Sequence, residues 1–297
     1  MLANRMKNIN HLPLSFELFP PKTEEGMAKL MTQRELLSSC NPRFFSITYG
    51  AGGTTRDRTQ QLVLDINQKG TPAVPHLSCI GDTRQSLTLL LDSYKQAGIQ
   101  KIVALRGDLP ASMEDVANDF HYANELVQFI RQQYGDAFEL IVAAYPEVHP
   151  EADCAQTDMS NFKRKVAAGA SAAITQYFFN PDAYEDFINR CHQENIQIPI
   201  YPGIMPITNY EKLARFSSRC GAEIPRWLAK RLLDYRDDET SLRAFGIDVV
   251  TQLCKKLLEI GVPGFHFYVL NQAEPTLNIL KQLGLKQFSS NPLSAAR

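Results

Sequence analysis

Short apolar segments alternate with longer amphipathic segments along the whole chain. The apolar segments are rich in β-branched and aromatic residues and are bounded by Gly, Pro or polar residues, which is typical of buried strands. They occupy residues 14–19, 44–49, 74–79, 101–106, 139–145, 172–179, 198–204 and 264–270. The pattern therefore predicts eight strands.

The segments between these strands carry apolar residues at helical spacing. They are residues 24–38, 58–69, 83–97, 118–134, 156–168 and 181–194, then 209–218, 225–235 and 239–260, and finally 273–283. Pro181 suits a first helical turn, and Gly98 and Gly169 suit helix C-terminal ends. We therefore expect repeated βα units, with extra helices inserted between the seventh and eighth strands.

This succession predicts an α/β protein that folds as a closed (β/α)8 (TIM) barrel. No linker-like composition divides the chain, so we expect one domain over residues 1–297, with an N-terminal arm (1–13) and a loose tail (286–297). An open doubly wound sheet is the alternative, but the glycine signature of dinucleotide binding is missing. The nearest match, GAGG at 50–53, lacks the third glycine at the required spacing.

Charge and composition narrow the class of ligand. The chain has 31 basic and 32 acidic residues and no basic stripe, which argues against nucleic acid and favours a small molecule. Its longest apolar stretch, residues 140–145, is far shorter than the roughly 20 residues of a membrane span. The N-terminus has no apolar signal segment, so we expect a cytoplasmic protein without a membrane partner. The 6 cysteines are widely spaced and are expected to be reduced.

The first predicted strand carries a carboxylate on the side that faces the barrel interior. Alternation places Phe16 and Leu18 toward the helices and therefore turns Glu17 toward the barrel mouth. A carboxyl group among aromatic neighbours is poorly solvated, which favours its protonated form and suits general-acid catalysis. A structural glutamate paired with a lysine or arginine explains the same pattern, and the sequence leaves both interpretations open.

The fourth predicted strand ends in Arg106, Gly107 and Asp108. Catalytic groups of such barrels come from the carboxyl ends of the strands and the loops that follow them. The small glycine allows a flat ligand to approach the backbone while the two charges reach different parts of it. The alternative is a turn with a local ion pair. His76, inside the third strand, is expected to be at most a hydrogen-bonding group for a ligand.

The loop after the fifth strand carries Tyr145, His149 and two carboxylates between two prolines, which stiffen it. We do not expect a metal site here, because His149 and Glu151 have no third ligand at a recognised spacing.

The helix that follows this loop carries polar residues on one face. They are Asp158, Asn161 and Lys165, with Arg164 adjacent. Such a stripe is ordinarily a solvated surface, but beside a barrel mouth it suits the sugar and diphosphate of a cofactor.

Two further residues suit the recognition of a ring. Gln176, near the end of the sixth strand, offers both a donor and an acceptor to a ring edge. Tyr210, after the seventh strand, offers a stacking face. Ordinary packing explains both equally well.

Taken together, these segments resemble the methylenetetrahydrofolate reductases of bacteria, in the FAD-dependent, single-domain form. The matching segments run in the family's order from about residue 14 to 285. They are SFELFPPKT (15–23), FFSITYGAGG (44–53), PHLSC (75–79), IVALRGDLP (102–110), VAAYPEVHPEA (142–152), NFKRKVAAGA (161–170), AITQYFF (173–179), PGIMP (202–206), IPRWL (224–228) and HFYVLN (266–271).

The resemblance implies an oxidoreductase that reduces 5,10-methylenetetrahydrofolate to 5-methyltetrahydrofolate, a step that supplies methyl groups for methionine synthesis. NADH or NADPH would reduce non-covalently bound FAD and leave before the folate binds, in a ping-pong reaction. Glu17 matches the family's general acid, and Asp108 matches the aspartate near both flavin and pterin. Gln176, Tyr210 and Gln272 match substrate-facing positions.

The resemblance also implies the contacts to the flavin and a homo-oligomer. The flavin contacts are Thr48, Tyr49, Ala51, His76, Arg106, Gly107, Asp108, Ala123, Tyr145, His149, Ala152, Asp158, Asn161, Arg164 and Lys165. Two departures from the family pattern stand out. Gln272 occupies the arginine position of the usual LNRAE segment, and residues 111–121 differ from the family.

Two other functions are less favoured. An aldolase-type barrel requires a Schiff-base lysine on a strand, and the only strand-associated lysine, Lys101, is at the wrong end. A non-catalytic, folate-carrying barrel is expected to lack Glu17 or Asp108, and both are present.

Overall fold

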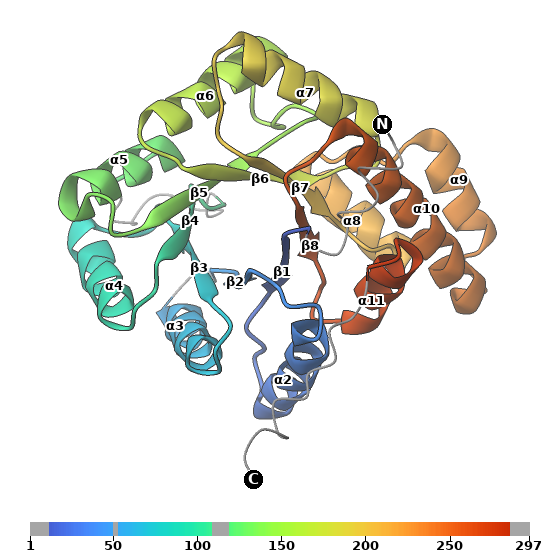
Figure 1. Cartoon of the computed structure of the whole chain (residues 1–297), viewed down its shortest axis with the longest axis horizontal. Helices are drawn as coiled ribbons and strands as arrows, with labels where there is room; N and C mark the ends of the chain where they lie inside the picture. Colours follow the sequence, from blue (N-terminus) through green and yellow to red (C-terminus); the bar gives the residue numbers. More distant parts are fainter. Residues whose placement is uncertain (1–11, 50–52, 109–118, 286–297) are drawn as a thin grey trace.

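The strands of this protein close on themselves. The computed structural model describes residues 12–49, 53–108 and 119–285, and within them parallel strands pair in chain order to form a closed barrel (Figure 1). The strands are Leu14–Leu18 (β1), Phe44–Ile47 (β2), Ala73–Ser78 (β3), Lys101–Leu105 (β4), Glu139–Ala144 (β5), Ala172–Tyr177 (β6), Ile200–Ile204 (β7) and Phe265–Tyr268 (β8). Because β1 pairs with β8, the predicted (β/α)8 barrel is confirmed and the open-sheet alternative is wrong.

Helices surround the barrel and follow the predicted order. They are Glu24–Ser38 (α2), Gly53–Gln68 (α3), Arg84–Gln96 (α4), Ala123–Tyr134 (α5), Ala155–Ala167 (α6), Pro181–Gln193 (α7), Tyr210–Cys220 (α8), Arg226–Asp234 (α9), Glu239–Ile260 (α10) and Ala273–Gln282 (α11). The predicted helix ends at Gly98 and Gly169 are confirmed by left-handed backbone, with φ of 75° and 116°. Pro181 begins α7 after an Asn180 cap, also as predicted.

Several element boundaries differ from the prediction. Helix α3 begins at Gly53 rather than at residue 58. The helix predicted over residues 118–134 corresponds to α5, which begins at Ala123; residue 118 itself lies outside the described residues. Strand β8 ends before the predicted residue 270, because Leu270 and Asn271 adopt φ of 50° and 55°. A strand requires strongly negative φ, so this left-handed pair stops it.

Alternation along the strands separates two apolar layers. Phe16, Phe45 and Phe267 pack outward into the main core beneath the helices. Phe44, Val74, Val103, Ile141, Ala172 and Ile174 form a smaller cluster, which fills the barrel interior as the alternation requires. On the same inward face, Glu17 and His76 lie toward the carboxyl ends of β1 and β3.

The predicted insertion between β7 and β8 is present as α8, α9 and α10. Figure 1 shows these helices on one side of the barrel, in the orange part of the chain. Helix α10 also contacts α7 and α11, so the insertion joins the outer helical layer. Within the described residues, no helix is long and apolar enough to cross a membrane.

Candidate active site

Glu17 lies at the centre of the barrel mouth with two imidazole rings beside it. Its Oε2 is 3.4 Å from Nε2 of His76, on β3, and 3.8 Å from Nε2 of His266, on β8. Its side chain keeps 20% of its exposure, so one edge of the carboxyl group remains accessible. No lysine or arginine pairs with Glu17 in the part of the chain that the structure describes. The structural ion pair considered for this residue is therefore absent there.

His76 is buried beside this carboxyl group. Burial lowers the pKa of its imidazole below the ordinary value, while the nearby Glu17 acts in the opposite direction. The ring is therefore neutral near pH 7, and its Nε2 has no hydrogen-bond partner among the described residues.

The end of β4 meets the end of β3 in a close backbone crossing. Gly107 has φ of +90°, and a Cβ there would lie 1.9 Å from Oγ of Ser78. The Ser78 hydroxyl donates to the carbonyl of Arg106 (2.8 Å), as does the amide of Ile80 (2.9 Å). The positive φ favours glycine, and any other side chain would also displace the Ser78 hydroxyl.

The two charges beside Gly107 do not form the local ion pair considered as an alternative. The guanidinium of Arg106 instead donates two hydrogen bonds of 2.6 Å to the carboxylate of Glu151, in the loop after β5. This contact raises the pKa of Arg106 and lowers that of Glu151. Asp108 is exposed and lies near enough to Tyr145 for its charge to raise the pKa of that phenol.

The loop after β5 is held in a strained conformation. Val148 adopts φ of 71°, which is rare for a β-branched residue. The amide of His149 donates to Asp158 (3.1 Å), and its Nδ1 accepts from the amide of Glu151 (3.1 Å). The ring of Tyr145 meets the His149 ring edge-on, with centroids 4.4 Å apart. The structure thus brings together three predicted site residues, Tyr145 and His149 of this loop and Asp158 of α6.

Helix α6 brings its cations to the same side. Nζ of Lys165 donates to the carbonyl of Ala143, on β5, at 2.6 Å. Burial lowers the pKa of this ammonium to about 8. Nη1 of Arg164 donates to Oδ1 of Asn161 (2.9 Å), and both side chains are exposed.

The residues after β2 hold the neighbouring loop. The amide of Thr48 donates to Leu18 and its carbonyl accepts from Thr59. The phenol of Tyr49 donates to Asp82 (2.7 Å), a carboxylate that Arg56 also contacts (2.9 Å). Ala51 lies outside the described residues.

The remaining predicted residues are placed by different elements. Gln176, on β6, lines a small cavity of about 10 Å³ together with Tyr145, and Tyr210 begins α8. Gln272 is exposed just before α11, Ala123 begins α5, and Ala152 follows the β5 loop. No contact joins Tyr210 or Gln272 to Glu17 among the described interactions.

Three site residues were missed by sequence reasoning. His266 is wholly buried in β8 and bonded to Ser15, and strand alternation places it on the face of Glu17. Asn271 clamps the first loop, since its amide exchanges two hydrogen bonds with the backbone of Phe19 (3.1 and 2.8 Å). Glu151 was considered only as a metal ligand. The inward position of His266 was readable from the strand pattern, whereas the other two contacts span distant segments.

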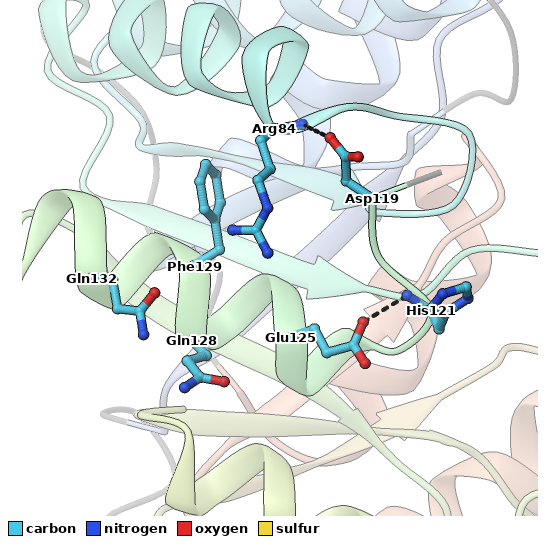
Figure 2. Close-up of a pocket in the computed structure, with 7 residues that line it drawn as sticks. All are labelled: Arg84, Asp119, His121, Glu125, Gln128, Phe129 and Gln132. Atoms are coloured by element: carbon cyan, nitrogen blue, oxygen red, sulfur yellow. Dashed lines mark hydrogen bonds between the residues drawn. The ribbon is translucent and has the colours of Figure 1, made fainter. Parts of the chain in front are cut away.

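A larger cavity, of about 250 Å³, lies away from Glu17, between the beginnings of α4 and α5. Figure 2 shows Arg84 beside the ring of Phe129, with its backbone amide bonded to Asp119. None of the predicted site residues lines this cavity. It is an open groove between helices, and the predicted chemistry lies at the strand ends instead.

The closed barrel and the polar groups at the carboxyl ends of its strands define an enzyme of the (β/α)8-barrel class. A family model described as methylenetetrahydrofolate reductase matches residues 3–284. The chain belongs to this family of oxidoreductases.

Individual relatives agree with this assignment. The 5,10-methylenetetrahydrofolate reductase of Escherichia coli (strain K12) is 41% identical over 274 residues, which cover 92% of this chain and 91% of that protein. The Buchnera aphidicola protein of the same name is 40% identical, covering 96% and 97%. Methylenetetrahydrofolate reductase (NADH) 1 of Arabidopsis thaliana is 39% identical over 91% of this chain but only 48% of its own length.

A solved structure shares the fold at low sequence identity. A Clostridium thermocellum protein, described as binding two copies of 5-methyl-5,6,7,8-tetrahydrofolic acid, superposes with a TM-score of 0.60 at 18% identity. It covers 95% of this chain and 97% of its own.

Proposed function

We propose that this chain reduces 5,10-methylenetetrahydrofolate to 5-methyltetrahydrofolate, with NADH or NADPH as electron donor and non-covalently bound FAD as carrier. The names of the bacterial relatives support the reaction, and the plant names support NADH. The observation that carries the proposal is the carboxyl group of Glu17, which lies in the barrel mouth between two imidazoles, with no cationic lysine or arginine partner among the described residues.

The residues around the mouth fit a flavin dinucleotide. The buried Nε2 of His76 has no hydrogen-bond partner in residues 12–49, 53–108 and 119–285, which leaves a polar atom for a ligand. Asn161, Arg164 and Lys165 bring an amide and two cations to one helix, which suits a sugar and a diphosphate. FAD, when bound, supplies the chemistry of hydride acceptance from a nicotinamide and hydride delivery to the folate.

The protein's own contribution to the folate step is proton donation. The Glu17 carboxyl gives its proton to one nitrogen of the five-membered ring, and the bond from that nitrogen to the bridging methylene breaks. The methylene remains on the other nitrogen as an iminium, which hydride addition converts to the methyl group. The negative charge of Asp108 favours this cation, and Gln176 and Tyr210 hold the substrate. Gln272 offers an amide where relatives offer a guanidinium.

Substitution of Glu17 by Gln tests the proposal. Flavin reduction by a nicotinamide needs no acid, so this half-reaction should remain largely intact, whereas the folate half-reaction should slow by about 10²–10⁴-fold. Stopped-flow flavin absorbance, run separately with NADH and with the folate, measures both. Equal slowing of both phases, or an unchanged folate phase, would remove Glu17 as the acid. Purified protein without a flavin spectrum would contradict the cofactor.

We also infer that the chain works as a single-domain, cytoplasmic homo-oligomer that binds only small molecules. The relationship to bacterial enzymes of nearly equal length supports this inference. Sedimentation velocity of the purified protein tests the oligomeric state, and a single monomeric species would contradict it.

A further inference from the structure

His266 is a buried titratable residue that the proposed mechanism does not use. It is wholly buried on β8, and its Nδ1 lies 2.8 Å from the hydroxyl oxygen of Ser15, on β1. Its other nitrogen, Nε2, has no hydrogen-bond partner within the part of the chain that the structure describes. That nitrogen faces Oε2 of Glu17 at 3.8 Å. The contacts therefore run from Ser15 to His266 and from His266 to Glu17, the proposed acid.

Which of Ser15 and His266 donates the hydrogen bond between them follows from the need of each buried O–H or N–H group for an acceptor. Ser15 is 5% exposed, and its contact with Nδ1 is its one hydrogen bond among the described residues. If Nδ1 carried the proton, the hydroxyl proton of Ser15 would be buried without an acceptor, which costs about 1–3 kcal/mol. The bare Nε2 would then also turn its lone pair toward a carboxylate oxygen. Both penalties vanish when Ser15 donates to Nδ1 and Nε2 carries the proton.

We propose that Ser15 and His266 are positioning residues that hold the Glu17 carboxyl by one oxygen, Oε2, and leave Oε1 to carry the transferred proton. This inference rests on the proposed role of Glu17 as the acid. The Nε2–H of His266 donates toward Oε2, so this oxygen acts as an acceptor whether or not the carboxyl is protonated. The separation of 3.8 Å is longer than a hydrogen bond, and such contacts commonly shorten when substrate binds.

Other groups around the Glu17 carboxyl are consistent with Oε2 as the acceptor and Oε1 as the oxygen that carries the proton. The Nε2 of His76 approaches the same oxygen, Oε2, from β3. Tyr268, on β8, is near enough for Glu17 to raise the pKa of its phenol, but its hydroxyl donates to the carbonyl of Thr175 (2.7 Å). No contact of Oε1 competes for the proton among the described residues. The transferred proton thus belongs to Oε1, the oxygen that neither imidazole faces.

Nitrogen NMR of the histidine rings tests the tautomer directly, without using activity. The chain has 6 histidines, so selective ¹⁵N labelling gives few ring signals, and the signal lost in His266→Gln identifies His266. We expect a protonated Nε2 and a hydrogen-bonded, unprotonated Nδ1 in the native protein. In Ser15→Ala we expect part of the population to shift to the Nδ1–H tautomer. A native Nδ1–H ring, or a doubly protonated one, would overturn the proposal.

Half-reaction kinetics of the same holoenzyme variants test the consequence. Ser15→Ala should slow the folate phase by about 3–10-fold, the effect of one ordinary hydrogen bond, and leave flavin reduction unchanged. Thr251→Val is a matched control, because Thr251 is a buried hydroxyl on α10 whose oxygen has no hydrogen-bond partner. It should change neither phase. A folate phase unaffected by Ser15→Ala and His266→Gln would overturn the proposal.

Glu17→Gln, measured beside these variants, separates the role of Glu17 as the acid from its positioning by Ser15 and His266. If Glu17→Gln slows the folate phase and the Ser15 and His266 variants do not, the acid stands and its positioning by these residues is wrong. If Glu17→Gln itself leaves the folate phase unchanged, the proposed acid is wrong, and the tautomer measured by NMR still decides the orientation of the Ser15–His266 pair.

Discussion

At the scale of single residues, several charged groups around the barrel mouth already have protein partners. The guanidinium of Arg106 donates two hydrogen bonds to Glu151, and Lys165 donates to a backbone carbonyl on β5. The charged stripe on α6 is therefore only partly a solvated surface. The ammonium of Lys165 loses solvation and gains only a neutral carbonyl as its hydrogen-bond partner. This loss of solvation disfavours the charged form and lowers the pKa of Lys165.

Lys165 should make stability depend on pH in the alkaline range. Burial lowers its pKa in the folded protein from 10.5 to about 8. Between these values the unfolded chain holds the proton and the folded chain does not, so the free energy of unfolding rises with pH. We expect a gain on the order of 1–3 kcal/mol across this window in flavin-free protein, relative to Lys165→Met. Parallel urea-unfolding curves for the two proteins from pH 8 to 10.5 would contradict this expectation.

Asp108 should influence the flavin through its charge. If Asp108 lies beside the flavin as proposed, Asp108→Asn removes a negative charge and should raise the reduction potential. A charge at this range contributes about 1–2 kcal/mol, or on the order of 20–40 mV for a two-electron couple. Dye-equilibrated titration of the bound flavin measures the potential. An unchanged value, with FAD still bound, would place Asp108 away from the flavin.

At the scale of elements, the barrel mouth depends on how strand ends cross one another. The end of β4 passes so close to β3 that Gly107 has no room for a side chain. The clamp from Asn271 to Phe19 likewise joins the ends of β8 and β1. In both contacts a polar side chain of one strand end meets the backbone of the next, and this holds the site residues in place.

Gly107→Ala should destabilise the protein more than a glycine replacement with a similar backbone and free space. Gly70 is the matched control, because its φ is +87° and nothing lies within 4 Å of a Cβ there. Gly70→Ala should cost about 1–2 kcal/mol for the left-handed backbone alone. Gly107→Ala should cost more, because the added methyl group displaces Ser78, and Ser78→Ala should recover part of the difference. Equal unfolding free energies for the two alanine variants would contradict the close crossing.

At the scale of the whole molecule, the barrel and its helical layer bury most of the thiols. The cysteines all lie in described parts of the chain and are free; among them Cys154 is exposed, Cys220 is half-buried and the others are buried. Hydrogen bonds from Thr157 and the start of α6 lower the pKa of this thiol. Its neighbours along the chain, Asp153 and Gln156, are exposed as well.

Thiol labelling should therefore report the integrity of the fold. With the native protein, Ellman's reagent should label Cys154 in a fast phase, and all 6 thiols should react after denaturation. Cys154→Ser should abolish the fast phase without changing the final count by more than one thiol. A fast phase that survives this substitution would show that a second cysteine is open to solvent.

Much of the fold could be predicted because its signals are local. Strand segments and helical periodicity depend on neighbouring residues, so the barrel order and the inserted helices were readable. The end of β8 was missed because the apolar Leu270 continues the strand pattern and no glycine marks the left-handed pair at Leu270 and Asn271. The inward directions of Glu17 and His266 were readable from alternation, whereas their proximity was not, since they come from different strands.

The sequence by itself determined the fold class, the family and the position of each candidate residue along its strand, because these follow from periodicity and from ordered motifs. Only the tertiary structure decided which charges meet. Arg106 pairs with Glu151, 45 positions away, instead of with its near neighbour Asp108. Ser15 meets His266 across 251 positions, because closure of the barrel brings β1 and β8 side by side. The physical reason is that barrel closure sets distances between strands that no local pattern encodes.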